Sequence, residues 1–267
     1  MIVLKIGGDI LEEGLNPTLV ADIKELAKVE QLVIVHGGGD EVTETAEKLG
    51  KPQKFIVSPS GIRSRYTDKE TVMIYSMVMA GKINKETVAF LLSKGVPAFG
   101  LSGVDGTLLR AERKKRLIVA DERGRKRIID GGFTGKIDQV NTDAVQLLVK
   151  KGYVPVVAPI ALGKEFELLN VDSDRAAANI AGALGAEKIV FLTDVPGVLV
   201  NKRLTRKLSA TEAEEIRPKI GPGMDKKVLA STEAIKMGVK EAIIAPGNVK
   251  NPVTQAINHR SGTVITP

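Results

Sequence analysis

The feature that most constrains the fold is the stretch at residues 31–41, where an apolar run ends in three consecutive glycines. Its four apolar residues, three of them β-branched, predict a buried strand at 32–35. A helical pattern begins at about Asp40, so the glycines fill a strand-to-helix turn. Glycine lets backbone N–H groups face outward in conformations that other residues avoid. Because helix N-termini favour anions, this turn is a candidate phosphate site.

The N-terminus repeats this design. Residues 2–6 read as a strand, which Gly7 and Gly8 follow directly. Lys5, near the end of that strand, adds a mobile positive charge. Two such turns in one α/β chain could form the two sides of a phosphate pocket, although either turn alone could be merely a tight connection.

Composition limits the class of protein. With 267 residues the chain can form one large α/β domain or two lobes with a sizeable core. It contains no cysteine, which excludes disulfides and thiolate chemistry and fits a cytoplasmic protein. There is no run of eighteen apolar residues and no charged-then-apolar leader, so we expect neither a membrane span nor secretion. The charge-rich composition without cysteine or tryptophan also suits a thermophile.

The net charge of +7 is concentrated in residues 107–127, which carry +6. Nine basic residues there outnumber three acidic ones; the basic ones are Arg110, Arg113, Lys114, Lys115, Arg116, Arg123, Arg125, Lys126 and Arg127. Such a run is either a solvated hairpin or a surface for an acidic partner. The segment has no aromatic residue to stack on bases, so we do not expect a nucleic acid.

Along the chain, helical and strand patterns alternate. Helices are expected at 17–29, 41–49, 69–79, 83–93, 141–151, 173–184, 211–217 and 224–237, with a polar loop at 61–68. Further strands are expected at 96–101, 153–160, 188–193, 241–245 and 262–266, with a basic hairpin from 116–120 to 127–129 that turns near Gly124. This order predicts an α/β fold with a mainly parallel sheet covered on both faces. We expect two lobes of one sheet, 1–168 and 169–267.

Several polar residues suit phosphoryl transfer without a covalent intermediate. The fingerprints of P-loop and Rossmann sites are absent, and His36 is interpreted as structural. The segment 170–174 offers an amide and two carboxylates at a helix start. Lys227 lies in the first turn of a helix, where its charge opposes the dipole, so a ligand phosphate explains it better than folding does. Transfer of a phosphoryl group needs mainly positioning and charge neutralisation.

The expected loop at 61–68 carries a possible carboxylate-binding group. Arg63 and Arg65 flank a serine beside Tyr66, and two guanidinium groups could grip a carboxylate in a bidentate fork. They could equally face solvent.

Together these segments resemble the amino acid kinase family, and most closely its branch of acetylglutamate kinase and carrier-protein relatives. The resemblance covers nearly the whole chain and rests on six motifs in order: Lys5-x-Gly7-Gly8, His36-Gly-Gly-Gly39, Arg65-x-Thr67-Asp68, Asn170-Val-x-x-Asp174, Thr193-Asp-Val-x-Gly197 and Gly223-Met-x-x-Lys227. It implies a three-layer αβα sandwich, an ATP-binding C-terminal lobe and an acyl-substrate N-terminal lobe.

The resemblance also implies residue roles. Lys5 and Lys227 would stabilise the transferring phosphoryl group, and Asp174 would orient them. Backbone N–H groups of Gly8 and Gly38 would donate to its oxygens. The amino acid would be held by Gly38, Gly39, Arg65 and Asn170, with Arg63 and Tyr66 beside them. The nucleotide would be bound by Lys5, Gly7, Gly8, Thr193, Asp194, Val195, Gly197, Met224 and Lys227. Mg²⁺ would bridge the β- and γ-phosphates and be held mainly by ATP.

Two departures point within the family to kinases of 2-aminoadipate, or glutamate, attached to a small acidic carrier protein. One is the extra arginine and tyrosine at 64–67, and the other is the basic hairpin. Opposed charge would speed and orient docking of such a carrier. The expected docking residues are Arg113, Lys114, Lys115, Arg116, Arg125, Lys126 and Arg127.

Two alternatives stay open, a kinase of free N-acetyl-L-glutamate and a non-catalytic sensor. A homodimer paired through the N-terminal lobes is the family default. The kinase hypothesis requires Lys5 and Lys227 to share one cleft.

Overall fold

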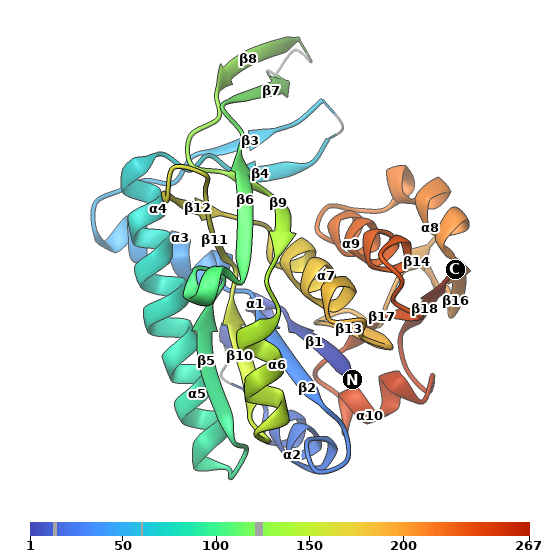
Figure 1. The fold of residues 1–267 in the computed structure, drawn as a ribbon. Helices are drawn as coiled ribbons and strands as arrows, with labels where there is room; N and C mark the ends of the chain where they lie inside the picture. Colours follow the sequence, from blue (N-terminus) through green and yellow to red (C-terminus); the bar gives the residue numbers. More distant parts are fainter. Residues whose placement is uncertain (13–14, 60, 121–124) are drawn as a thin grey trace.

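The computed structural model describes residues 1–12, 15–59, 61–120 and 125–267 (Figure 1). Its main sheet has eight strands in the order β16-β18-β17-β13-β1-β2-β10-β5. In chain order these are β1 (Ile2–Ile6), β2 (Leu32–His36), β5 (Ala98–Ser102), β10 (Val154–Ala158), β13 (Lys188–Thr193), β16 (Lys207–Ser209), β17 (Glu241–Pro246) and β18 (Thr263–Thr266). All neighbouring pairs are parallel except β17 and β18. The predicted mainly parallel sheet is confirmed.

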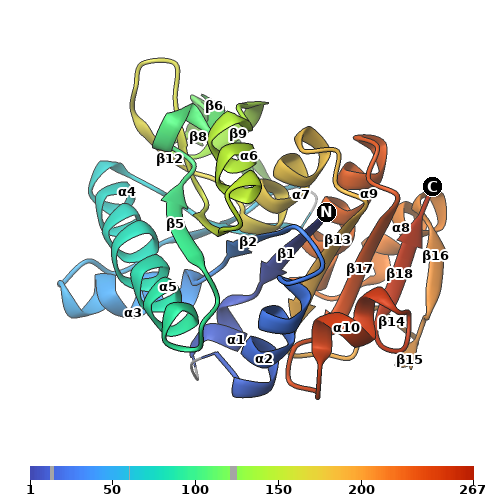
Figure 2. The same ribbon diagram turned by 60° about the horizontal axis from the view of Figure 1, so that its bottom comes forward.

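Helices cover both faces of this sheet (Figure 2). On one face lie α2 (Pro17–Leu26), α5 (Asn84–Ser93) and α10 (Pro252–Ile257). On the other lie α6 (Asp143–Lys150), α7 (Ser173–Ala183), α8 (Ala210–Ile216) and α9 (Met224–Lys236). Because side chains alternate along a strand, Leu4 packs toward the α2 face and Val3 toward the α7 face. Lys5 therefore points to the same side as Val3.

A long helical stretch and a second sheet stand beside the main sheet. The stretch comprises α4 (Lys69–Ser76), a π-helical segment (Met77–Ile83) and α5, so the two helices predicted at 69–79 and 83–93 form one continuous run. The second sheet is β12-β11-β6-β9, built from β6 (Leu109–Arg113), β9 (Gly135–Val140), β11 (Ile160–Leu162) and β12 (Leu168–Asn170). The sequence did not predict this second sheet.

Two hairpins extend from that end of the molecule (Figure 1). The first pairs β3 (Phe55–Val57) with β4 (Arg63–Arg65), so the prediction of a loop throughout 61–68 was wrong. The second pairs β7 (Arg116–Ala120) with β8 (Lys126–Asp130), as predicted, while the turn near Gly124 and Arg123 lie outside the described residues. Further elements are α1 (Gly8–Glu12), α3 (Gly39–Lys48), and the paired β14 (Leu199–Val200) and β15 (Arg203–Leu204). Within the described residues, no helix has the length and apolar character needed to cross a bilayer.

Candidate functional site

The two glycine turns lie side by side at the carboxyl ends of two central strands of the main sheet. Strands β1 and β2 are neighbours with Ile6 opposite His36, so the residues that follow them lie side by side. A Cβ atom on Gly8 would lie 3.1 Å from the backbone nitrogen of Gly38, and one on Gly37 would lie 2.9 Å from the nitrogen of Gly8. Gly38 also has a φ of 135°, which side chains disfavour. Glycine is therefore required here by close approach as well as by conformation.

Lys5 and Lys227 contact the same carboxylate. The ammonium nitrogen of Lys5 lies 2.8 Å from Oδ1 of Asp174, and that of Lys227 lies 3.5 Å from Oδ2. Lys5 comes from β1, Asp174 from the first turn of α7 and Lys227 from the first turn of α9. Burial alone would raise the pKa of Asp174, but the charges of Lys5 and then Lys227 outweigh it and lower that pKa. The predicted convergence of the two lysines is present.

The second carboxylate of this segment has a structural task. Asp172 is the N-cap of α7, and its Oδ1 accepts the backbone N–H groups of Asp174 and Arg175, both at 3.1 Å. This cap satisfies two helix N–H groups that otherwise lack partners. It leaves Asp174 as the carboxylate that serves the lysines.

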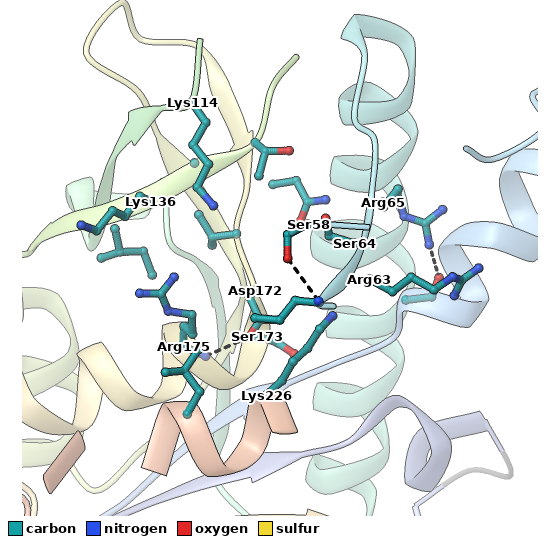
Figure 3. A pocket seen from close by; sticks show the side chains of 18 of the residues that line it. Ser58, Arg63, Ser64, Arg65, Lys114, Lys136, Asp172, Ser173, Arg175 and Lys226 are labelled. Atoms are coloured by element: carbon teal, nitrogen blue, oxygen red, sulfur yellow. Dashed lines mark hydrogen bonds between the residues drawn. The ribbon is translucent and has the colours of Figure 1, made fainter. Parts of the chain in front are cut away.

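A cavity of about 910 Å³ opens beside this cluster (Figure 3). Its lining comes from both hairpins, β9, the first half of α7 and one side of α9 along its length. The predicted residues that line it are Gly38, Gly39, Arg63, Arg65, Lys114 and Asn170. Ser173 and Lys226, which are chain neighbours of the Asp174–Lys227 pair, form part of its wall. The phosphate-site candidates and the substrate-site candidates are therefore adjacent.

The arginines of β4 are held differently. The guanidinium of Arg65 donates to the carbonyl oxygen of Gly39 at 2.6 Å, to Oγ1 of Thr43 at 2.8 Å and to the side chain of Gln53. Arg63 instead lies 3.7 Å above the ring of Phe55. Arg65 is thereby fixed at the start of α3, next to the triple-glycine turn, while Arg63 is held by stacking.

Of the two other predicted substrate side chains, that of Asn170 lines the cavity and that of Tyr66 does not. The amide nitrogen of Asn170 donates to Oγ1 of Thr67 at 2.9 Å, which fixes that side chain at the cavity wall. Tyr66 does not line the cavity, and its ring lies 5.5 Å from the ammonium group of Lys54.

Several cavity residues were not predicted. Arg175 makes a two-pronged ion pair with Glu233 of α9, with nitrogen–oxygen distances of 2.8 and 2.6 Å. Lys136 of β9 and Lys226 of α9 also face this space (Figure 3). Arg175 and Lys226, like Lys227, are cations in the first turn of a helix, where they oppose the dipole. The same criterion that singled out Lys227, a basic residue in the first turn of a helix, would therefore have identified Arg175 and Lys226.

The candidate nucleotide residues follow the neighbouring strand. Strand β13 pairs with β1, and the N–H of Gly7 donates to the carbonyl oxygen of Leu192 at 3.3 Å. At the end of β13, the hydroxyl of Thr193 donates to Oδ1 of Asp194 at 3.0 Å. Gly197 has a φ of 140°, and a Cβ there would lie 2.8 Å from Oγ1 of Thr263. The segment 193–197, which includes Val195, thus lies at the same carboxyl ends of the strands as the glycine turns. Met224, at the start of α9, packs against the core.

The predicted docking residues do not form one surface. Lys114 lines the cavity, where burial and then the charge of Arg175 lower its pKa. Arg113 lies 4.0 Å above the ring of Phe133 and donates from Nε to the carbonyl oxygen of Gly132 at 2.6 Å. The exposed members are Lys115, Arg116, Arg125, Lys126 and Arg127.

Comparisons with known proteins identify the family and the fold. The profile described as "Amino acid kinase family" matches residues 1–246. A protein of Cenarchaeum symbiosum is 59% identical, over 99% of each chain. A Metallosphaera sedula protein named LysW-aminoadipate/LysW-glutamate kinase is 46% identical over the full length of both chains. The crystal structure of smu.665 from Streptococcus mutans UA159 superposes with a TM-score of 0.81 at 26% identity, covering 99% of this chain and 98% of that one. The chain belongs to the amino acid kinase family.

Proposed function

We propose that this protein transfers the γ-phosphoryl group of ATP to the side-chain carboxylate of 2-aminoadipate whose amino group is attached to a small acidic carrier protein. The product is an acyl phosphate, for reduction in lysine biosynthesis. The observation that carries the proposal is the contact of Lys5 and Lys227 with one buried carboxylate. The name of the Metallosphaera sedula relative supports the choice of substrate.

In this proposal the lysines neutralise charge on the migrating group. Lys5 and Lys227 stabilise the phosphoryl oxygens, and Asp174 holds the two ammonium groups in place. The backbone N–H groups of Gly8 and Gly38 donate to the same oxygens. Fixed donors aimed at developing charge are the main source of catalysis where the protein forms no bond to the phosphoryl group.

The nucleotide is proposed to lie beyond the ends of β1 and β13, against Gly7, Met224 and the segment 193–197. This assigns ATP to a C-terminal lobe of residues 169–267 and the acyl substrate to residues 1–168. Mg²⁺ neutralises charge on the ATP phosphates when it is bound. Within the part of the chain that the structure describes, no three acidic or histidine side chains are grouped as a metal centre, so Mg²⁺ would take most of its ligands from the nucleotide.

The amino acid is proposed to occupy the cavity. Gly38, Gly39, Arg65 and Asn170 would hold it, with Arg63 at the rim, and the basic side chains of the β7–β8 hairpin would receive the carrier. Tyr66 remains a proposed substrate residue, although it would have to act from outside the present lining. Carrier-linked glutamate, for arginine biosynthesis, is proposed as a second substrate, because the two differ by one methylene, worth only about 1–3 kcal/mol of discrimination.

We further propose a homodimer that works in the cytoplasm. Among the described strands, β5 is one of the two edge strands of the main sheet, and Phe99 on it packs edge-to-face with Tyr153 at 5.8 Å between ring centroids. Both residues are more than two-fifths exposed, and Leu92 of α5 is half exposed. An exposed apolar sheet edge is an unstable surface for a monomer and suits a two-fold interface. The cysteine-free, charge-rich composition supports the cytoplasmic and thermophilic assignments.

A phosphorylation assay tests the function. The protein, ATP and Mg²⁺ are incubated with carrier-linked 2-aminoadipate, with carrier-linked glutamate or with free N-acetyl-L-glutamate, and hydroxylamine traps the acyl phosphate. We expect trapped product with the two carrier-linked substrates and little with the free one. Full activity on free N-acetyl-L-glutamate without any gain from the carrier would instead assign the protein to acetylglutamate kinases. Carrier binding without ATP turnover would support a sensor.

A further inference from the structure

A buried polar chain lies behind the triple-glycine turn. His36 is the last residue of β2, and Asn84 is the first residue of α5; both side chains are fully buried. The amide nitrogen of Asn84 lies 3.3 Å from Nε2 of His36. On the other side of the imidazole ring, Nδ1 lies 2.9 Å from the carbonyl oxygen of Gly37. These contacts connect the start of α5 with the first glycine of the turn.

The surroundings of Asn84 determine which ring nitrogen carries the proton. Its amide nitrogen lies 2.9 Å from the carbonyl oxygen of Val156 and 3.3 Å from that of Leu101, and these oxygens fix the orientation of the amide. An amide nitrogen only donates, so its two hydrogens are shared among these oxygens and Nε2 of His36. Nε2 of His36 is therefore the bare nitrogen, and Nδ1–H donates to Gly37. Burial lowers the pKa of His36 to about 4, so the ring is neutral at pH 7.

The hydrogen bond from His36 orients the N–H group of the next residue. The Gly37–Gly38 peptide is trans, and in a trans peptide the carbonyl and the following N–H point in opposite directions. Holding the Gly37 carbonyl against His36 therefore turns the Gly38 N–H away from His36. Among the described residues, no acceptor is found for this N–H or for that of Gly8 beside it. Both N–H groups are available to a ligand.

The π-helical segment brings the supporting residues to this point. It ends at Ile83, immediately before Asn84, and Cδ1 of Ile83 would lie 2.1 Å from a Cβ on Gly38. A Cβ on Gly100 would lie 2.3 Å from Oδ1 of Asn84, so glycine at that position leaves room for the amide. π-Helical turns are rare and frequently occur at functional sites. Here the widened turn packs one residue against the glycine turn and places the next against His36.

We infer that Asn84 and His36 are positioning residues for phosphoryl transfer: they hold the Gly37–Gly38 peptide so that its N–H donates to the migrating group. The inference rests on the proposed function for the identity of that group, whereas the orientation of the peptide can be tested without it. Neither side chain touches the phosphoryl group itself. Asn84 fixes the tautomer of His36, and His36 fixes the peptide.

Two substitutions of His36 test the contacts of Nδ1 and Nε2 separately. Asparagine carries its amide nitrogen near the place of Nδ1, so His36→Asn retains a donor to Gly37. Glutamine reaches the place of Nε2 instead, so His36→Gln retains only the contact with Asn84. Loss of one fixed oxyanion donor lowers kcat by roughly 100- to 1,000-fold, and a misdirected donor in His36→Gln should lower it by about 10- to 100-fold. His36→Asn should stay within about threefold of the wild-type kcat, and neither variant should change the KM for ATP by more than about twofold.

Crystal structures and melting temperatures of both variants complete the test. We expect the Gly37–Gly38 peptide to be turned over in His36→Gln and retained in His36→Asn, although both variants lose similar stability. A wild-type kcat in His36→Gln, or the same peptide orientation in both variants, would overturn the inference. If the wild-type protein shows no kinase activity, the proposed function fails, while the difference in peptide orientation would still support the positioning role.

Discussion

Asp174 is the residue on which the candidate site depends, because one buried carboxylate serves two ammonium groups. The residue pattern alone did not distinguish Asp172 from Asp174; the family resemblance assigned the orienting role to Asp174. The structure separates them, since the helix cap uses Asp172 and the burial of Asp174 makes its partners essential. A buried charge left without a partner is strongly destabilising.

Replacing Asp174 by asparagine should therefore reduce stability in a pH-dependent way. At pH 7, Asp174→Asn leaves two lysines without their counter-charge and should lower the free energy of unfolding by about 3–5 kcal/mol. The pKa of Asp174 is lower in the folded state than in the unfolded state, so its contribution is fully present above the ordinary carboxyl range. That contribution is lost as the pH falls below that range. Urea unfolding of both proteins from pH 7 to pH 3 should show the difference narrowing on acidification, whereas a constant difference would contradict the charge argument.

Lys227→Met tests the proposed role of the second lysine. We expect kcat to fall at least about 100-fold with little change in carrier binding, because the charge matters most in the transition state. Lys219→Met, which removes an exposed lysine before α9, is the control and should keep wild-type kinetics. Initial rates measured at varied concentrations of ATP and carrier give kcat and the KM for each substrate. A rise in KM with an unchanged kcat would show that Lys227 contributes to substrate binding and not to the transition state.

At the scale of elements, the β7–β8 hairpin stands out because it carries exposed basic side chains away from the main sheet (Figure 1). Its strands pair over five residues, with Ile118 opposite Ile128, and both of these apolar side chains are more than half exposed. Charge of one sign on an exposed element attracts an opposite partner over about a Debye length.

Charge reversal on the hairpin should weaken carrier docking. In Arg116→Glu/Lys126→Glu, the KM for the carrier should rise about tenfold at low salt, with kcat little changed. The wild-type KM should rise steeply with added salt, and that of the variant should rise less. Lys151→Glu, at the far end of α6, makes a matched control. Identical salt dependence in all three proteins would exclude a docking role for the hairpin.

Seven strands of the main sheet were predicted from the sequence and the edge strand β16 was not, while the elements around the cavity were predicted less well. Short stretches rich in apolar and β-branched residues predict buried strands such as β1 and β13. Strand β4 has the sequence Arg-Ser-Arg and pairs over only three residues, so it has no apolar alternation to detect. The π-helical turn has no periodicity of its own that distinguishes it from an α-helix. The Arg175–Glu233 pair joins residues 58 positions apart, a contact that only the packing of α7 on α9 creates.

At the scale of the whole molecule, the two edge strands of the main sheet differ. The edge at β5 carries exposed aromatic side chains, and the edge at β16 is a very short strand. At the β5 edge the exposed rings of Phe99 and Tyr153 pack together. The opposite edge is β16, a three-residue strand. Short edge strands resist further pairing, so β5 is the better surface for a second copy.

Phe99→Arg should convert the proposed dimer to a monomer, because it places a charge in the middle of the apolar edge. Light scattering coupled to size-exclusion chromatography measures the mass directly. Leu199→Arg, which also replaces an exposed apolar residue but lies on β14, should keep the wild-type mass. A monomeric wild-type protein would refute the proposed assembly.

The shared carboxylate has a consequence for the resting protein. Two ammonium groups set against one carboxylate leave an uncompensated positive charge inside the molecule before any nucleotide arrives. Like charges held close together repel, so this centre is under electrostatic tension when it is empty. A polyphosphate relieves that tension, and occupancy by ATP or even pyrophosphate should make the whole chain harder to unfold. The centre with unbalanced positive charge in the free protein is therefore the centre that a bound polyphosphate should stabilise most.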